Sequence, residues 1–373
     1  MLVIATDVFS KGGIQRYIRY QLKALREAGI FERVWSMSLV GKNEDDHFEG
    51  EEEAVDYVGG GIGLFSKARF FWKAIFLVKR KNIGMVICNH VGFAPMAYLI
   101  KKLFKVPYGI NVYGLEIWTG LGWMEAAALK KANFIIGDCN FILDYLNKNL
   151  GIARDKLFLL YDCVDTAVFK KEPVPDDVYR KYGIPKDKKI ITTIGRMVYD
   201  KGQETMIRLL GSLPEDVVYV LIGGGPRLEE WRGLAKDLGV ADRVVFTGRV
   251  PEEDLMCMYN IGDLSIYLSE FKPHEGGGLP LVLIEASSCG KPIISSNEDG
   301  AAEAVVDGKN GYLVEPRNEE MIVQKIRAIL YSRNLKELMG EYGRKYCEEH
   351  FSYPVFRDEQ ERILKQVLER NKS

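Results

Sequence analysis

Short apolar runs alternate with amphipathic stretches from one end of the chain to the other. This alternation is typical of parallel β-strands joined by α-helices that cover both faces of a sheet. The sequence therefore predicts an α/β fold made of doubly wound, Rossmann-like parallel sheets. The expected strands are Leu2–Asp7, Arg33–Leu39, Met85–Asn89, Tyr108–Val112 and Phe134–Gly137, and then Ile190–Ile194, Val217–Gly223, Arg243–Thr247, Asp263–Leu268, Pro292–Ser295 and Gly311–Val314.

A proline- and charge-rich segment separates the two sets of strands. It covers Lys170–Lys189 and suits an interdomain linker. A chain of 373 residues is long enough for two domains of ordinary size. We expect an N-terminal domain over residues 1–168, a C-terminal domain over residues 169–352, and a charged amphipathic helix within residues 353–373.

The composition excludes several classes of protein. A net charge of −1 gives no electrostatic reason to expect nucleic-acid binding. The six cysteines are scattered without a Cys-x-x-Cys pair, which argues against a zinc site and favours a reduced, cytoplasmic protein. No apolar run has the length of a membrane span, and the first residues resemble a strand rather than a signal peptide.

A glycine-rich loop leads into a short apolar helix that carries one carboxylate. Gly276–Gly278 let a ligand approach the backbone, and Pro280 suits the first helical position. The residues Leu281–Ile284 predict a helix that is buried on all sides, so Glu285 needs a specific partner. A helix N-terminus favours anions. The stretch therefore predicts a nucleotide site, with diphosphate at the helix start and sugar hydroxyls on Glu285.

Two further loops follow expected strands. Arg196 and Lys201 stand five residues apart after the strand Ile190–Ile194, where both cations can converge on one diphosphate. The alternative is that both are solvated loop cations. Gly12 and Gly13 follow the first strand and open a helix, which suits the approach of an anion but also suits a plain turn.

These motifs, in register over nearly the whole chain, resemble those of the retaining glycosyltransferases of family 4, which belong to the group 1 glycosyltransferases. The resemblance implies the GT-B fold, in which two Rossmann-like domains face a cleft. It also implies that the C-terminal helix packs back on the N-terminal domain. By the same resemblance, Arg196 and Lys201 neutralise the departing nucleoside diphosphate, and the loop at Gly12 and Gly13 faces the donor phosphates.

The sequence departs from the family's pattern at one carboxylate. The pattern has two glutamates eight residues apart; Glu285 matches the second, and Gly277 stands at the first position. We expect Glu275 to take the catalytic place of the missing glutamate, with Glu270 as an alternative. Gly277 otherwise leaves room for a larger donor sugar.

The remaining donor contacts are backbone groups and one cation. Gly278 and Leu279 are the expected backbone donors to the diphosphate, because Pro280 has no N–H group. The strand before Arg249 resembles the family's strand beside the nucleobase, so this side chain either contacts the base or faces solvent.

The acceptor side is predicted around Tyr113. Many relatives have a histidine at this position, and the resemblance places it at the donor sugar. Tyr113, Glu116 and Trp118 are therefore the candidate residues of the sugar pocket, and Trp118 suits stacking on a sugar ring. The alternatives are a tyrosine at the edge of the core and a hydrophobic surface loop.

The stretch Leu64–Lys81 combines aromatic and basic residues on one predicted helix. Such a helix can lie at a membrane surface that holds a lipid-linked acceptor. The alternative is a core helix with a solvated edge.

Taken together, the resemblance implies transfer of a sugar from a nucleoside-diphosphate sugar to a hydroxyl of a glycan or a lipid-linked acceptor. It implies retention at the anomeric carbon, no obligatory metal and no separate cofactor. A GT-B sugar-nucleotide epimerase and a non-enzymatic nucleotide-binding paralogue are the alternatives.

Overall fold

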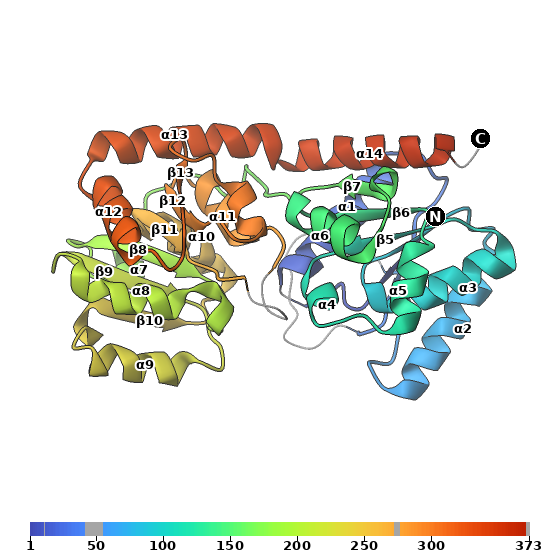
Figure 1. Ribbon diagram of the computed structural model, residues 1–373, viewed down its shortest axis with the longest axis horizontal. Helices are drawn as coiled ribbons and strands as arrows, with labels where there is room; N and C mark the ends of the chain where they lie inside the picture. The colour runs from blue at the N-terminus through green and yellow to red at the C-terminus, as the bar shows by residue number, and fades with distance from the viewer. Residues whose placement is uncertain (11, 42–54, 272–276, 371–373) are drawn as a thin grey trace. The chain divides into compact units, whose positions relative to one another are not determined.

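The computed structural model describes residues 1–10, 12–41, 55–271 and 277–370 (Figure 1). The chain divides into two compact units. Unit 1 consists of Met1–Cys163 together with Tyr353–Ser373, and unit 2 consists of Val164–Ser352. The C-terminal segment therefore belongs to the same unit as the N-terminus.

Unit 1 contains a seven-stranded sheet in the order β3-β2-β1-β4-β5-β6-β7, and every strand pair is parallel. Helices connect the strands, so the sheet is doubly wound around β1 and β4. The strands are β1 (Leu2–Ala5), β2 (Trp35–Ser38), β3 (Tyr57–Val58), β4 (Val86–Cys88), β5 (Tyr108–Val112), β6 (Phe134–Gly137) and β7 (Leu157–Leu159). The helices are α1 (Gly13–Glu27), α2 (Leu64–Arg80), α3 (Ala94–Phe104), α4 (Leu115–Trp118), α5 (Trp123–Lys130), α6 (Asn140–Leu150) and α14 (Tyr353–Arg370).

Unit 2 repeats this architecture with a six-stranded parallel sheet in the order β10-β9-β8-β11-β12-β13. The strands are β8 (Lys189–Ile194), β9 (Val217–Ile222), β10 (Val244–Gly248), β11 (Leu264–Tyr267), β12 (Ile293–Ser296) and β13 (Gly311–Val314). The helices are α7 (Asp176–Tyr182), α8 (Gln203–Leu209), α9 (Leu228–Asp237), α10 (Glu252–Ile261), α11 (Leu281–Ser288), α12 (Glu319–Leu330) and α13 (Arg333–His350). Two 3-10 turns, η3 (Tyr199–Lys201) and η6 (Gly300–Ala304), follow β8 and β12.

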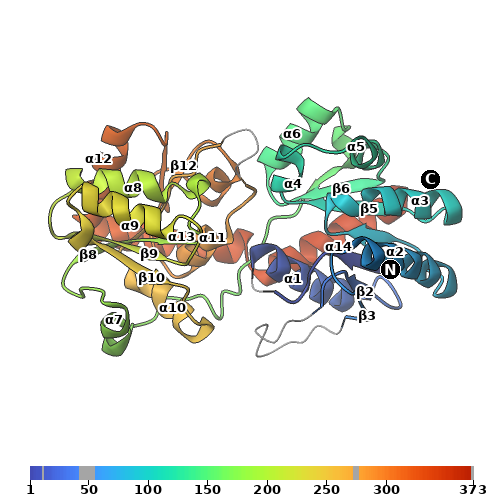
Figure 2. The same cartoon turned by 90° about the horizontal axis from the view of Figure 1, so that it is seen from below.

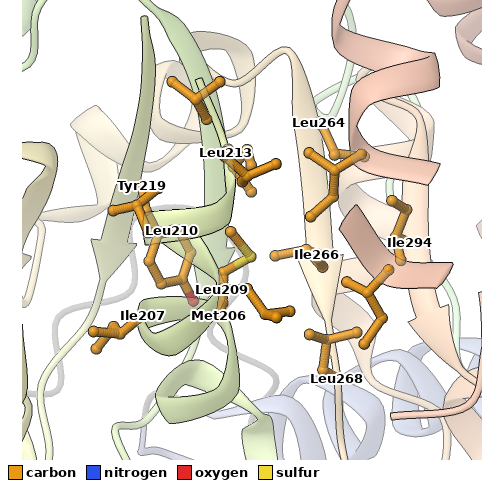
Figure 3. Close-up of a cluster of buried hydrophobic side chains, with 14 of the residues drawn as sticks. Met206, Ile207, Leu209, Leu210, Leu213, Tyr219, Leu264, Ile266, Leu268 and Ile294 are labelled. Atoms are coloured by element: carbon orange, nitrogen blue, oxygen red, sulfur yellow. The ribbon is translucent and has the colours of Figure 1, made fainter. Parts of the chain in front are cut away.

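The largest core of unit 2 lies between its sheet and the helices on one face. Met206 and Leu209 of α8 are buried against Ile266 and Leu268, at and beyond the end of β11, as Figure 3 shows. Burying one such side chain stabilises the fold by about 1.5–3 kcal/mol. This core holds the strand ends in place, and the loops that follow the strands are positioned by it.

The C-terminal helix α14 packs against α1 in unit 1, where both helices lie side by side (Figure 2). Phe356 of α14 meets the ring of Tyr17 edge-on at 5.4 Å, and Gln360 donates from Nε2 to the carbonyl oxygen of Gln21 at 3.2 Å. The hydroxyl of Tyr353 donates to Glu27 at 2.7 Å. The helix thus closes the core of unit 1 although it lies more than 300 residues away from α1 in sequence.

The fold class predicted from the sequence is confirmed, and each expected strand is present. Two strands were missed. Both β3 and β7 lie at the outer edges of the unit 1 sheet, where they span only two and three residues. The two residues of β3 are too few to carry an apolar pattern.

The segment predicted as a linker was wrong in part. Residues 176–182 form α7, and Val178 and Ile184 are buried in a core cluster with strands β8 and β9. The charged composition reflects the exposed face of this short helix. No helix in the described parts of the chain is long and apolar enough to cross a membrane.

Candidate donor and acceptor sites

The order of the strands locates a site at the carboxyl edge of the unit 2 sheet. Strand order reverses between β8 and β11, and ligands of doubly wound sheets bind where the strands on either side of this point end. Arg196 and Lys201 follow β8, and Tyr267 ends β11. The predicted pair of cations is therefore at the position that the topology favours.

The loop that carries Lys201 packs tightly on the end of β11. Gly202 has φ of 70°, and a Cβ atom there would lie 2.2 Å from the carbonyl oxygen of Leu268. Only glycine fits both the left-handed conformation and the close contact. This contact holds Lys201 next to Tyr267.

The ammonium group of Lys201 is held by a carboxylate and a phenol. Its Nζ lies 2.9 Å from Asp200 Oδ2 and 5.4 Å from the centroid of the Tyr267 ring. Burial alone would lower the pKa of Lys201, but Tyr267 and Asp200 outweigh it, and the pKa is raised above its usual value. Burial raises the pKa of Tyr267 to about 12. Lys201 is therefore a fixed positive charge at neutral pH.

A second buried carboxylate lies in the same neighbourhood. Asp299 precedes η6 and accepts a hydrogen bond from the backbone N–H of Ala301 at 2.9 Å. Burial raises its pKa, while the Ala301 N–H, Ser269 and the charge of Lys201 act in the opposite direction. Asp299 therefore contributes to the electrostatic environment of Lys201.

Arg196 has an exposed side chain and a fixed backbone. Its carbonyl oxygen accepts from Nε2 of the buried Gln203 at 3.2 Å. The next residue, Met197, donates its N–H to the carbonyl of Gly224 at 3.0 Å. The turn is thus tied to the neighbouring loop after β9, which leaves the guanidinium accessible to a ligand.

Arg249 lies at the same edge of the sheet, after β10. The N–H of Gly223 donates to the carbonyl of Gly248 at 2.9 Å, which joins the loops after β9 and β10. The Arg249 side chain passes over Gly224, because a Cβ atom on that glycine would lie 3.4 Å from Arg249 Cγ. Its side chain is exposed beside the loop that contacts Met197.

Glu285 lies in the middle of α11, which is buried along almost its whole length as predicted. The carboxylate is 3% exposed, and its Oε2 accepts a short hydrogen bond from the hydroxyl of Tyr259 in α10. Pro280 is the N-cap and the helix begins at Leu281, one residue later than expected. Gly290 follows the C-cap with φ of 70°.

The glycine-rich loop is described from Gly277 onward. A Cβ atom on Gly277 would meet nothing within 4 Å, Gly278 is half-buried, and the Leu279 side chain is buried. Glu275 lies outside the described residues. The alternative, Glu270, is 27% exposed at the carboxyl edge after β11, with Oε2 3.9 Å from Arg317 Nε.

Unit 1 has a cavity at the equivalent point of its own sheet, where strand order reverses between β1 and β4. The cavity measures about 530 Å³ and is lined by residues that follow these strands, including Asp7 and Asn89, and by Gln15 from α1. Gly12 and Gly13 are exposed at the start of α1, beside Gln15. These two glycines therefore lie in a different unit from Lys201.

Tyr113 and Glu116, which were predicted for a sugar pocket, line this cavity. The Tyr113 hydroxyl donates to Asn89 Oδ1 at 2.7 Å, and the Tyr113 N–H donates to Glu116 Oε1 at 2.7 Å. Burial raises the pKa of both Tyr113 and Glu116. The wall of the cavity thus carries neutral and carboxyl hydrogen-bonding groups suited to hydroxyls.

Trp118 does not line the cavity. Its ring is buried and meets Tyr145 edge-on at 4.3 Å and Phe141 at 5.8 Å, both on α6. The aromatic contacts of α6 turn this side chain into the core of unit 1. Stacking of Trp118 on a sugar ring is therefore not supported by its position.

Two family models match consecutive parts of the chain. The model described as Glycosyltransferase Family 4 matches residues 11–168, and the model described as Glycosyl transferases group 1 matches residues 176–346. The chain belongs to the group 1 glycosyltransferases of the family 4 type. The first match falls in unit 1 and the second in unit 2.

Relatives and solved structures agree with this membership. A GDP-mannose-dependent alpha-(1-6)-phosphatidylinositol monomannoside mannosyltransferase from Mycobacterium tuberculosis is 33% identical over 250 residues, which are 63% of this chain and 63% of that protein. An N-acetyl-alpha-D-glucosaminyl L-malate synthase from Bacillus anthracis is 28% identical over 80% of this chain and 78% of that protein. A sucrose-phosphate synthase from Thermosynechococcus elongatus is 19% identical, with a TM-score of 0.80 over 98% of each chain. The last similarity establishes the GT-B fold.

Several polar residues of this glycosyltransferase were missed from the sequence. Tyr259, Tyr267 and Asp299 come from different segments, and only the fold brings them to Lys201 or Glu285. Asp200 had a local signal because it directly precedes Lys201 in the sequence. Asp299 had a weaker one, since an acidic residue directly before a glycine follows an expected strand. The tyrosines are indistinguishable from core residues in the sequence.

Proposed function

We propose that this chain transfers a sugar from a nucleoside-diphosphate sugar to an acceptor hydroxyl, with retention at the anomeric carbon and without a metal ion. The observation that carries the proposal is the presence of two cations in the loop after β8, where the strand order of unit 2 reverses: exposed Arg196, and Lys201, which Asp200 and Tyr267 hold in its charged form. A leaving diphosphate needs such charges at this place.

The mechanism follows from where charge develops. Breaking the bond between sugar and diphosphate builds negative charge on the leaving oxygen and positive character on the sugar ring. Arg196, Lys201 and the backbone N–H groups of Gly278 and Leu279 stabilise the first, and preorganised donors of this kind commonly supply the largest part of catalysis. The two cations replace a metal ion in this role.

Glu285 orients the nucleotide by accepting hydrogen bonds from its ribose hydroxyls. One carboxylate oxygen is engaged by Tyr259, which limits the rotation of the carboxylate. Arg249 lies at the base end of the same edge. Glu275 or Glu270 holds the hydroxyls of the donor sugar in place of the family's first glutamate.

The acceptor binds in the cavity of unit 1, with its hydroxyls on Tyr113 and Glu116. The cavity volume of about 530 Å³ suits one or two sugar rings. The leaving phosphate takes the acceptor proton. Gly12 and Gly13 provide backbone groups to the donor phosphates.

The direct test is the release of nucleoside diphosphate with GDP-mannose, UDP-glucose and ADP-glucose as donors. The M. tuberculosis relative is named as GDP-mannose-dependent, so GDP-mannose is the first donor to test. Release that depends on an added glycan or lipid-linked acceptor supports the transferase. Conversion of the donor without acceptor would instead support an epimerase.

We also propose that α2 carries unit 1 onto a membrane surface that presents the acceptor. One face of α2 is buried through Phe70, Ala74 and Leu77. The opposite face exposes large apolar side chains, with Phe65 83% and Trp72 66% exposed. Basic residues and apolar side chains on one exposed face are the pattern of interfacial helices. The exposed residues include Leu64, Phe65, Lys67, Trp72, Phe76 and Lys79.

Sedimentation with liposomes that contain anionic lipid tests this contact. Wild type is expected to bind, and Lys79/Arg80/Lys81→Glu is expected to lose binding because the charge reversal repels anionic headgroups. A matched triple change away from α2, Lys188/Lys236/Lys309→Glu, should bind as wild type does. Absence of binding by wild type would end the membrane proposal and leave the transferase proposal intact.

A further inference from the structure

A second cavity lies at the opposite edge of the unit 2 sheet from Lys201. It measures about 850 Å³, and it is lined by Gly262 and Asp263, which precede β11, and by Lys291 and Pro292, which precede β12. All strands of this sheet are parallel, so their amino ends lie at the edge away from the loops after β8 and β11. The cavity is therefore separate from the candidate donor site.

Positive charge dominates the wall of this cavity. Seven lysine and arginine side chains line it, against four carboxylates. Some of the cations are structural: Arg344 donates to the carbonyl oxygens of Phe169 and Thr166 and pairs with Glu348. These contacts give Arg344 a structural role. They do not explain why lysines gather near the strand ends.

The three lysines at the strand ends outnumber the carboxylates near them. Lys336 pairs with Asp263 at 2.6 Å, which engages the carboxylate that precedes β11. Lys291 donates instead to a neutral group, the carbonyl oxygen of Asn260, at 2.8 Å. Lys171 has an exposed side chain on the same wall, and its Cδ atom passes near Gly290. Glu337 is a second carboxylate on this wall, and the charges of Lys171 and Lys336 act on it. Three ammonium groups therefore face two carboxylates.

The pKa of Lys291 shows that this arrangement is unfavourable for its charged form. Its pKa is lowered to about 8, chiefly by burial; Cys289 and Asp263 oppose this shift, and the charges of Lys171 and Lys336 contribute to it. A partly buried ammonium without an anionic partner is unfavourable. An anion with more than one negative charge would relieve the repulsion among the three lysines.

We propose that this cavity binds a small phosphate-bearing anion through Lys171 and Lys291. The lysines lie in a cavity of nucleotide size rather than on a flat surface, which favours a small molecule over an acidic protein. Lysine ammonium groups are common ligands of phosphate. The site is independent of the proposed transferase reaction, and it gives unit 2 a second anion site beyond the donor site.

Isothermal titration with sodium pyrophosphate tests the proposal on four forms of the full chain. Wild type is compared with a donor-loop variant (Arg196→Ala with Lys201→Met), a cavity variant (Lys171→Gln with Lys291→Met) and a matched control (Lys236→Gln with Lys309→Gln). The donor-loop variant and the control are expected to retain binding of pyrophosphate. The cavity variant is expected to lose at least about tenfold in affinity at this site, the equivalent of about 1.4 kcal/mol.

Two results would overturn the proposal. One is the loss of pyrophosphate binding in the donor-loop variant. The other is binding in the donor-loop variant that stays unchanged when Lys171→Gln and Lys291→Met are added to it. Lys171→Gln alone guards against misfolding, because this side chain is exposed. It should weaken pyrophosphate binding without changing the melting temperature. Unchanged affinity in that single variant would also count against Lys171 as a ligand. A parallel titration uses an acidic hexapeptide. Binding of the hexapeptide without binding of pyrophosphate would indicate a macromolecular partner and would contradict the small-anion site.

Discussion

The hydroxyl of Tyr259 donates a hydrogen bond to the carboxylate of Glu285, and this bond joins α10 to α11 inside unit 2. The carboxylate is almost fully buried, so its orientation is set by the protein rather than by solvent. A carboxylate held in one orientation can present its other oxygen to the hydroxyls of a ribose. The bond thus links the packing of two helices to recognition of a nucleotide.

Tyr259→Phe is expected to weaken binding of the nucleoside diphosphate by about five- to thirtyfold. Removing one hydrogen bond to a charged group costs about 1–2 kcal/mol and frees the Glu285 carboxylate to rotate. Isothermal titration measures the affinity. Tyr219→Phe is the matched control, because this buried hydroxyl donates to Thr193 at 2.8 Å and touches no candidate site residue. Equal loss of affinity in both variants would show that the effect is structural only.

Lys201→Met is expected to lower kcat by about 10²–10³-fold, the range seen when one preorganised charge donor is removed from a reacting oxygen. The raised pKa of Lys201 keeps its charge constant well above pH 9, so its deprotonation should not appear in the pH–rate profile between pH 6 and about 9. Steady-state kinetics on wild type and variant measures both effects. A variant with wild-type kcat would remove Lys201 from the mechanism.

The missing first glutamate can be located with two single variants. We expect Glu275→Gln to raise the KM for the donor sugar-nucleotide more than Glu270→Gln does, while neither changes the affinity for the free nucleoside diphosphate. The contrast isolates contacts to the sugar from contacts to the nucleotide. Glu298→Gln is the control, because Glu298 pairs with Arg317 next to Glu270. A larger effect in Glu270→Gln would assign the role to the residue after β11.

The lowered pKa of Lys291 predicts a pH dependence of stability. In the unfolded chain this lysine titrates near 10.4, so between pH 8 and 10 the unfolded state binds more protons and the folded protein gains stability as pH rises. The unfolding free energy of wild type relative to Lys291→Met should therefore increase by about 1–3 kcal/mol from pH 7 to pH 10.

Chemical denaturation at each pH measures this difference. Lys236→Met is the control for a lysine whose side chain is exposed, and its difference from wild type should stay constant. Lys291 faces Asp263, Lys171, Lys336 and Cys289. These four groups are present in wild type and in both variants, so the denaturant midpoints of all three proteins include their contribution to stability. A constant difference for Lys291→Met from pH 7 to pH 10 would show that its pKa is not lowered.

The fold was accessible from the sequence because its strands are short, apolar and evenly separated. Strand β5 covers the residues expected for it, and so does β13. Boundaries elsewhere shift by one or two residues, as at Pro280, because a proline with extended ψ caps α11 instead of entering it. The edge strand β3 escaped notice, since two residues carry no periodic pattern.

The candidate site was less accessible, because its residues meet only through the fold. Lys201 was visible as a cation after a strand, yet its partner Tyr267 lies 66 residues further on, at the end of β11. The position of Trp118 was predicted wrongly, because the sequence does not show whether a tryptophan side chain in a loop packs into the core or faces a ligand. In the structure its ring contacts Tyr145 of α6. Loop motifs therefore predict at which edge of the sheet a site lies better than they predict which side chains are in contact there.

The central claim is that Lys201 and Glu285 bind a nucleoside diphosphate at the carboxyl edge of the unit 2 sheet. Thermal unfolding in the presence of UDP, GDP and ADP, on wild type and on Lys201→Met with Glu285→Ala, tests it most directly. One nucleoside diphosphate at ~100 times its dissociation constant should stabilise wild type by about 2.7 kcal/mol and leave the double variant unchanged. No stabilisation of wild type by any of the three, or equal stabilisation of both proteins, would contradict the claim.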